Sequence, residues 1–192
     1  MEDVLGAILA GGRATRFGCP KATASLGGRP LLDWPLRALE DAGIETVVVA
    51  KADTALPPDA APVWEEPDEP VHPLVGIVTA LEQADGRAVL ACACDLPFVT
   101  PALATYMAGC EAPVAVPRAG DRMHPLFARY SQPVLPVLRA ALMEQRPLHE
   151  TLAGLHPRIV EEGELRRLGD PARLLFNVNT PEDLARAETM VS

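Results

Sequence analysis

The stretch VLGAILAGGRATRFGCPK, residues 4–21, joins an apolar run to a loop that is rich in glycine and basic residues. The apolar part, residues 4–10, predicts a buried β-strand. Residues 9–21 contain three glycines, two arginines and one lysine. Glycines let the backbone turn sharply and present N–H groups to a ligand, and the cations attract phosphate. The loop therefore predicts a site for a small phosphorylated anion, although it matches neither the P-loop nor the GxGxxG pattern.

Strand-like and helix-like segments alternate along the rest of the chain. Up to residue 109, we expect strands at 4–10, 45–50, 61–66 and 88–95, and helices at 30–42, 73–86 and 101–109. Beyond it, we expect strands at 113–118, 123–130 and 176–179, and helices at 131–145 and 181–190. This alternation predicts an α/β fold in which helices cover both faces of a mostly parallel central sheet, a three-layer α/β/α arrangement. The length of 192 residues favours a single domain, residues 1–192.

Composition and charge narrow the class of protein. The formal net charge of -9 argues against nucleic acid or an anionic membrane surface as a partner. The sequence has no apolar run of about 18 residues that would span a membrane. Its N-terminus carries acids where a signal peptide carries lysine or arginine, so we expect a cytoplasmic protein. Cys92 and Cys94 alternate within an apolar run, and we interpret them as small buried hydrophobes rather than metal ligands.

Asp95 stands directly after the most strand-like run of the sequence, AVLACAC. In open parallel sheets, ligands bind outside the carboxyl ends of the strands. A carboxylate at that position is costly to bury without a partner, and Mg²⁺ is a natural partner beside phosphates. Asp95 could instead cap the next helix, but Thr100 already stands at the capping position. We therefore expect Asp95 to contact a ligand or a metal.

Several short motifs together resemble the molybdenum cofactor guanylyltransferases. They are LAGG at 9–12, TR at 15–16, PK at 20–21, HPLVGI at 72–77, CDLP at 94–97 and FNVNTPEDL at 176–184. The resemblance implies a Rossmann-like nucleotidyltransferase fold and the transfer of GMP from GTP to molybdopterin, with Mg²⁺ as cofactor and pyrophosphate as product. It also implies GTP and molybdopterin as substrates and molybdoenzyme-maturation proteins as candidate partners.

The same resemblance assigns roles to individual residues. The nucleotide-binding positions it implies are Leu9, Ala10, Gly11, Gly12, Lys21, Glu66, Leu74, Gly76 and Asp95. The catalytic positions are Arg16, Lys21, Asp95 and Asn179, with Asp95 also the metal ligand. The acceptor-binding positions are His124, Asn177 and Asn179. Two alternatives stay open, because the two asparagines could bind only backbone and residues 73–77 could be only the start of a helix.

The chain departs from the family's pattern around the nucleotide. Pro20 replaces an aspartate before the loop lysine, Ala50 replaces an asparagine after the second strand, and His72 replaces a glycine. The family also has an aspartate, ahead of the motif at 72–77, that touches the ribose or base. Glu65, Glu66 and Asp68 are the candidates for this position here, and the best alignment favours Glu66.

Other functions use the same motifs. A cytidylyltransferase of the same cofactor pathway usually reads LAAG where this chain reads LAGG. A sugar-phosphate nucleotidyltransferase is generally longer and lacks the ending with two asparagines. A binding module that has lost catalysis is the alternative from another class, and it would take up nucleotide without releasing pyrophosphate.

Overall fold

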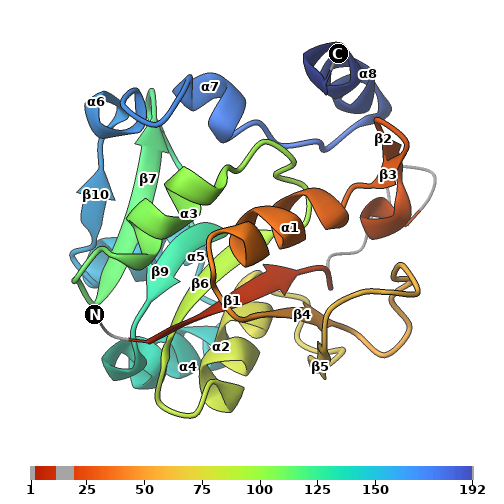
Figure 1. Cartoon of the computed structure of the whole chain (residues 1–192). Helices are drawn as coiled ribbons and strands as arrows, with labels where there is room; N and C mark the ends of the chain where they lie inside the picture. The colour runs from red at the N-terminus through yellow and green to blue at the C-terminus, as the bar shows by residue number, and fades with distance from the viewer. Residues whose placement is uncertain (1–2, 12–19, 192) are drawn as a thin grey trace.

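A mixed β-sheet forms the centre of the computed structural model, which describes residues 3–11 and 20–191 (Figure 1). Its strands are β1 (Val4–Leu9), β4 (Thr46–Ala50), β5 (Val63–Glu65), β6 (Ala88–Ala93), β7 (Val114–Ala119), β8 (Arg122–Met123), β9 (Phe127–Tyr130) and β10 (Arg158–Val160). The strand order is β10-β7-β9-β6-β1-β4-β5, and β8 pairs with β7. A separate hairpin is formed by β2 (Ser25–Leu26) and β3 (Arg29–Pro30).

The half of the sheet formed by β6, β1, β4 and β5 is entirely parallel. β1 lies between β4 and β6 and is parallel to both, and β4 is parallel to β5. β9 is antiparallel to both of its neighbours, β6 and β7, whereas β10 is parallel to β7. All six residues of β6 are buried, as expected for a strand covered on both faces. The expectation of a mostly parallel sheet is confirmed.

Helices cover both faces of this sheet, as expected (Figure 1). They are α1 (Asp33–Asp41), α2 (Leu74–Gln83), α3 (Pro101–Ala108), α4 (Leu135–Met143), α5 (Leu148–Gly154), α6 (Glu162–Leu165), α7 (Pro171–Leu174) and α8 (Pro181–Val191). Short 3-10 turns lie at Lys21–Thr23 and Gln132–Val134. One core joins the sheet to α1 and α3, and a second joins its other face to α2, α4 and α5. None of the described helices combines the length and apolarity needed to cross a bilayer.

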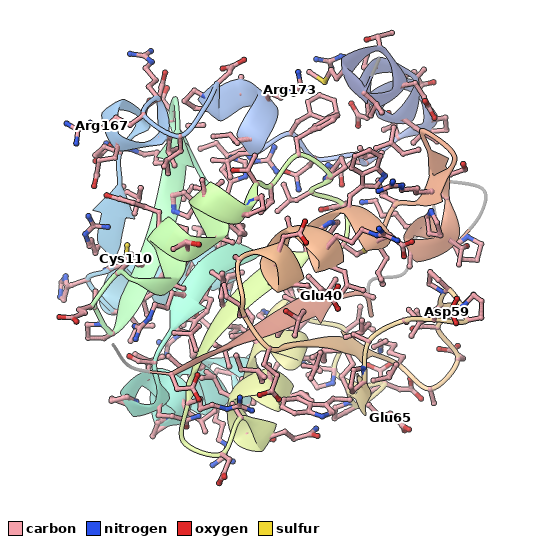
Figure 2. All side chains as sticks on the ribbon, in the orientation of Figure 1. Glu40, Asp59, Glu65, Cys110, Arg167 and Arg173 are labelled. Carbon is pink, nitrogen blue, oxygen red and sulfur yellow. The ribbon has the colours of Figure 1, made fainter. Side chains whose placement is uncertain are left out.

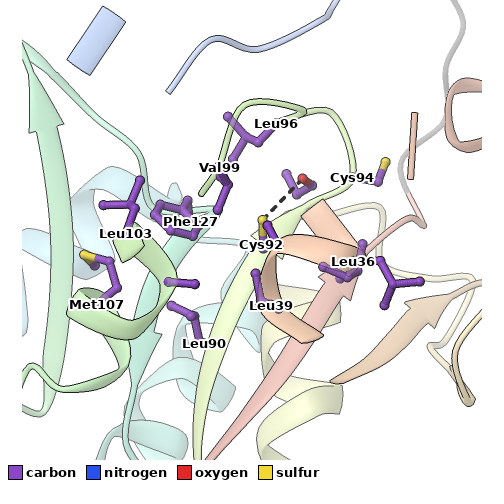
Figure 3. Packing of buried hydrophobic residues seen from close by; sticks show 14 of the residues in the cluster. Leu36, Leu39, Leu90, Cys92, Cys94, Leu96, Val99, Leu103, Met107 and Phe127 are labelled. Atoms are coloured by element: carbon purple, nitrogen blue, oxygen red, sulfur yellow. Dashed lines mark hydrogen bonds between the residues drawn. The ribbon is translucent and has the colours of Figure 1, made fainter. Parts of the chain in front are cut away.

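Cys92 and Cys94 belong to the first of these cores, among leucine and valine side chains (Figure 3). Burial raises the pKa of the Cys94 thiol to about 12, and the nearby Asp95 carboxylate acts in the same direction. Burial also raises the pKa of Cys92. Both thiols are therefore protonated at neutral pH, and the two cysteines pack as small apolar residues, as the sequence predicts.

A third apolar cluster joins the β2–β3 hairpin to the C-terminal segment. It joins Leu26 of the β2–β3 hairpin, Phe98 of the loop after β6, and Val178 and Ala187 near the C-terminus. The main-chain N–H of Gly27 donates to Glu188 Oε1 of α8 at 3.0 Å. In Figure 1, α8 lies beside the hairpin. This packing holds the C-terminal segment against the segment that follows the first loop.

Two expectations about local structure are wrong, and several short elements were not expected. Residues 176–179 form no strand, because the segment makes a single main-chain bond to the end of β6, from Val178 N to Asp95 O at 2.9 Å. The strand expected over 123–130 is interrupted by a turn, since the His124–Phe127 hydrogen bond closes the backbone there. The short elements between 146 and 175, like the β2–β3 hairpin, lack the periodicity that would have predicted them.

A core substitution tests how α1 is attached to the sheet. Leu39 is fully buried, and a Cβ added at Gly6 of β1 would lie 2.8 Å from its Cδ2, so helix and strand pack very closely here. We expect Leu39→Ala to lower the free energy of unfolding by about 2–5 kcal/mol in a urea titration. The neighbouring Glu40 is exposed (Figure 2), and Glu40→Ala should change it by less than about 0.5 kcal/mol. Equal losses in both variants would contradict this packing.

Candidate functional site

A pocket of about 770 Å³ opens at the carboxyl ends of the four parallel strands β1, β4, β5 and β6. One residue that follows each strand lines it: Gly11 after β1, Lys51 after β4, Glu66 after β5 and Asp95 after β6. Parallel strands bring their carboxyl ends to one edge of the sheet, so residues far apart in sequence converge there. The pocket is large enough for a nucleotide-sized ligand.

Most of the residues singled out from the sequence meet at this pocket. Its lining includes Leu9, Ala10, Gly11, Lys21, Glu66, Gly76, Asp95 and Asn179. Asn177 does not line the pocket, but its side chain hydrogen-bonds to Asp95, which does. Leu74, the first residue of α2, is fully buried in the core, and His124 is also absent from the lining. Gly12 and Arg16 lie outside the described residues, so their roles stay predictions.

A hydrogen-bonded network surrounds the Asp95 carboxylate. Lys21 Nζ donates to Asp95 Oδ2 at 2.6 Å and to Asn179 Oδ1 at 3.0 Å. Asn177 Nδ2 donates to Asp95 Oδ1 at 3.0 Å, so both oxygens of the carboxylate have partners. The Val178 N–H also bonds to the main-chain oxygen of Asp95, which fixes the C-terminal segment against the end of β6. The structure therefore assembles one polar cluster from three distant parts of the chain.

The donor set of this cluster suits a hard divalent cation. Asp95 and Asn179 present carboxylate and amide oxygens, the ligands that Mg²⁺ prefers, and the Lys21 ammonium already bridges them. Asn177 Oδ1 is buried and has no hydrogen-bond partner among the described residues. Nor do those residues contain a cluster of three or more His, Cys, Asp or Glu side chains that could hold a metal. A protein that offers Mg²⁺ so few ligands relies on substrate phosphates and water for the rest.

Glu66 occupies a slot between two glycines. A Cβ added at Gly11 would lie 1.7 Å from Glu66 Oε1, and one added at Gly76 would lie 2.9 Å from Oε2. Both positions therefore need glycine while the carboxylate is where it is. Glu66 is buried, whereas Glu65 is exposed at the outer edge of the sheet (Figure 2) and Asp68 is exposed. Of the three acids considered for this position, Glu66 is the one whose carboxylate is enclosed at the pocket.

Burial raises the pKa of the Glu66 carboxyl above its ordinary value. The Lys51 ammonium opposes this shift, and the Asp68 carboxylate adds to it. A charged group removed from water needs a compensating charge or hydrogen bonds, and a bound ligand with N–H or O–H donors would supply them.

Sequence reasoning missed Lys51 and His72 as pocket residues with polar contacts. Lys51 Nζ is buried and donates to the main-chain oxygens of Pro67 and Asp68. His72 Nδ1 accepts from the Leu74 N–H at 3.1 Å, so it caps the start of α2 beside the pocket. Lys51 directly follows the apolar run VVVA, just as Asp95 follows its own strand, and that placement could have indicated it.

His124 is buried near the site without reaching the pocket wall. Burial lowers the pKa of its imidazole to about 4, with Arg122 contributing and Asp95 opposing. The side chain is therefore neutral at neutral pH. Its contact with the acceptor stays a prediction.

The comparison with known families agrees with this geometry. The family model of the MobA-like NTP transferase domain matches residues 6–159, which run from within β1 to within β10 and include most of the pocket. The chain belongs to the MobA-like NTP transferase family. It is therefore an enzyme of the nucleotidyltransferase class.

Individual members of the family match nearly the whole chain. A probable molybdenum cofactor guanylyltransferase of Pelotomaculum thermopropionicum is 33% identical, with 99% of this chain and 94% of the relative covered. A molybdenum cofactor guanylyltransferase of Cereibacter sphaeroides is 34% identical, with 98% of this chain and 97% of the relative covered. The crystal structure of molybdopterin-guanine dinucleotide biosynthesis protein A from Archaeoglobus fulgidus superposes with a TM-score of 0.81 at 26% identity, covering 97% of each chain.

Gly11→Ala tests whether the slot for Glu66 matters for NTP binding. The new methyl group would overlap the end of the Glu66 side chain, which must move. Because only a side-chain end is displaced, we expect the fold to survive and NTP affinity to fall about tenfold or more, measured by calorimetry. Gly163 is exposed with open space around it, so Gly163→Ala should leave affinity unchanged. Unchanged affinity in the Gly11 variant would mean that the slot has no role in binding.

The raised pKa of Glu66 also has a consequence for stability. A carboxyl group whose pKa is higher in the folded than in the unfolded protein lowers stability once the pH exceeds the unfolded pKa. Glu66→Gln should therefore unfold at a higher temperature than the natural protein at about pH 8, and the difference should vanish near pH 4. Thermal unfolding followed by circular dichroism over this pH range measures it. A variant that is less stable at both pH values would contradict the cause given for the shift.

Proposed function

We propose that the protein transfers GMP from GTP to the terminal phosphate of molybdopterin, with Mg²⁺ as cofactor and pyrophosphate as the other product. The observation that carries this proposal is the cluster of Lys21, Asp95 and Asn179 at one end of a nucleotide-sized pocket. The curated relatives that bear the guanylyltransferase name cover the chain almost completely, which supports the choice of substrate.

The chemistry of this transfer suits the residues present. An oxygen of the acceptor phosphate forms a bond to the α-phosphorus of GTP while the bond from that phosphorus to the β-phosphate bridge breaks. All reacting groups are anions, so the reaction needs charge neutralisation and in-line positioning more than a protein nucleophile. Lys21 supplies a positive charge at the cluster, and Gly11 follows the end of β1, where a phosphate would enter.

Asp95 and Asn179 would hold Mg²⁺, with Asn177 orienting the Asp95 carboxylate through its 3.0 Å hydrogen bond. When bound, the ion supplies further charge neutralisation to the phosphates. Lys21, which donates to Asp95 Oδ2, would then share this carboxylate with the ion and bring its charge to the phosphates.

The remaining roles are assigned by their place in the sequence. We assign Arg16 to the neutralisation of the departing pyrophosphate and Gly12 to backbone contacts with the nucleotide. Asn177 and His124 are assigned to the acceptor side, and Leu74 supports the base pocket from the core. We also propose that the reaction takes place in the cytoplasm, with molybdoenzyme-maturation proteins as partners that receive the product.

Calorimetric titration with GTP, CTP, ATP and UTP tests the nucleotide, each with Mg²⁺ and again with EDTA. We expect GTP to bind best and only with Mg²⁺. A preference for CTP would make the protein a cytidylyltransferase on the same fold. Pyrophosphate release in the presence of molybdopterin then tests turnover, and binding without release would identify a module that has lost catalysis.

Asp95→Asn tests the role of the cluster. The substitution keeps the shape of the side chain but removes its charge, so we expect pyrophosphate release to slow by about 100-fold or more while the fold persists. Asp59 lies on an exposed loop (Figure 2) and does not line the pocket, so Asp59→Asn serves as the matched control. Activity of the Asp95 variant close to that of the control would remove Asp95 from the metal site.

A further inference from the structure

Lys51 is a buried cation in the wall of the pocket. The sequence contains two lysines, Lys21 and Lys51, and both line this pocket. Lys21 joins the Asp95 cluster, whereas Lys51 lies after β4, next to the strand end that carries Glu66. Only 9% of Lys51 is exposed. Lysine is almost never buried to this extent without partners, so its surroundings indicate what it does.

The contacts of Lys51 hold the backbone that follows Glu66. Its Nζ donates to the main-chain oxygen of Pro67 at 3.5 Å and to that of Asp68. The Asp68 carboxylate is 3.9 Å away with its side chain 74% exposed, so this ion pair contributes little. On the other side of Glu66, its own N–H donates to the Ala50 main-chain oxygen at 2.9 Å. The end of β4 therefore fixes the chain both at Glu66 and directly after it.

Lys51 also compensates the charge of Glu66. The carboxylate is enclosed between Gly11 and Gly76, where burial favours its protonated form. The positive charge of Lys51 lowers the pKa of this carboxyl, and the negative charge of Asp68 raises it. The other titratable side chains among the described residues of the pocket wall are Lys21, Asp53, His72, Cys94 and Asp95.

We propose that Lys51 is a positioning residue for base recognition: it fixes Glu66 beside Gly11 and Gly76 and keeps it ionised, so that the carboxylate accepts two adjacent N–H donors. This inference rests on the proposed function. An ionised carboxylate only accepts hydrogen bonds, and the Watson–Crick edge of guanine presents the N1–H and the 2-amino group side by side. Adenine, cytosine and uracil offer an acceptor next to their donor, which a carboxylate does not satisfy. Lys51 would thus contribute to selectivity for guanine without touching the base.

The first test compares GTP with ITP, which lacks the 2-amino group. We expect the natural protein to bind GTP about tenfold more tightly than ITP. Lys51→Met should reduce this ratio toward one, and it should raise the KM for GTP with little change in kcat. Lys51→Arg keeps the charge and should restore most of the ratio. Arg139→Met removes an exposed ion pair with Glu82 and is the matched control, expected to leave both quantities unchanged.

The pH dependence separates positioning from simple structural support. In Lys51→Met, GTP affinity should begin to fall at a higher pH on acidification than in the natural protein, because Glu66 takes up its proton more easily. In Glu66→Gln, this fall of GTP affinity on acidification should disappear. Adding Lys51→Met to that variant should cause no further loss of GTP selectivity. If Lys51→Met folds poorly, Lys51→Gln keeps hydrogen-bond donors for the two carbonyls and removes only the charge.

A measurement without nucleotide makes the inference independent of the proposed function. The Glu66 carboxyl carbon can be followed by NMR in protein labelled with ¹³C-glutamate, with Glu66→Gln identifying its signal. We expect its midpoint of titration to rise in Lys51→Met and Lys51→Gln but not in Lys51→Arg. An unchanged midpoint would overturn the inference whatever the substrate is. An altered midpoint with equal loss of GTP and ITP affinity would overturn the role in reading the base, and failure of the natural protein to bind GTP would overturn the proposed function.

Discussion

The half-buried carboxylate of Asp95 at the end of β6 is the constraint on which the site depends. Charge in this position must be balanced, and its partners Lys21 and Asn177 lie 74 and 82 positions away in the sequence. The chain therefore has to bring an N-terminal and a C-terminal segment to the same edge of the sheet. The apolar cluster between the β2–β3 hairpin and α8 holds both segments there, so the packing of an outlying hairpin supports the polar chemistry.

The pocket combines two environments that suit different parts of one ligand. Around Asp95, the side chains are polar and partly exposed, which suits phosphates and a divalent cation. Around Glu66, glycines and buried groups leave a narrow slot in which a carboxylate is enclosed. Lys51 links this second region to the end of β4. The parallel strands connect these two regions, because residues at or after the end of each strand line the pocket.

The predictable parts of the fold are those with a local pattern. The strands and helices that were expected up to α3 appear within a few residues of their expected bounds, because apolar periodicity and glycine stops are local features. Residues 176–179 form no strand, since a strand needs a neighbouring backbone, which no local pattern specifies. The acid enclosed between Gly11 and Gly76 illustrates the same limit. Glu65 and Glu66 are adjacent and chemically alike, and only the register of β5 decides that Glu66 is buried.

The sequence by itself determined the class of fold, the family and the loops that carry the chemistry, because these are written in short motifs and in the alternation of strands and helices. Only the tertiary structure decided which side chains meet. It joined Lys21, Asp95 and Asn179 into one cluster and brought Lys51 into hydrogen-bond contact with the main chain that follows Glu66. The physical reason is that charge compensation in a buried pocket depends on distances in space, and the folding of the sheet sets those distances independently of separation along the chain.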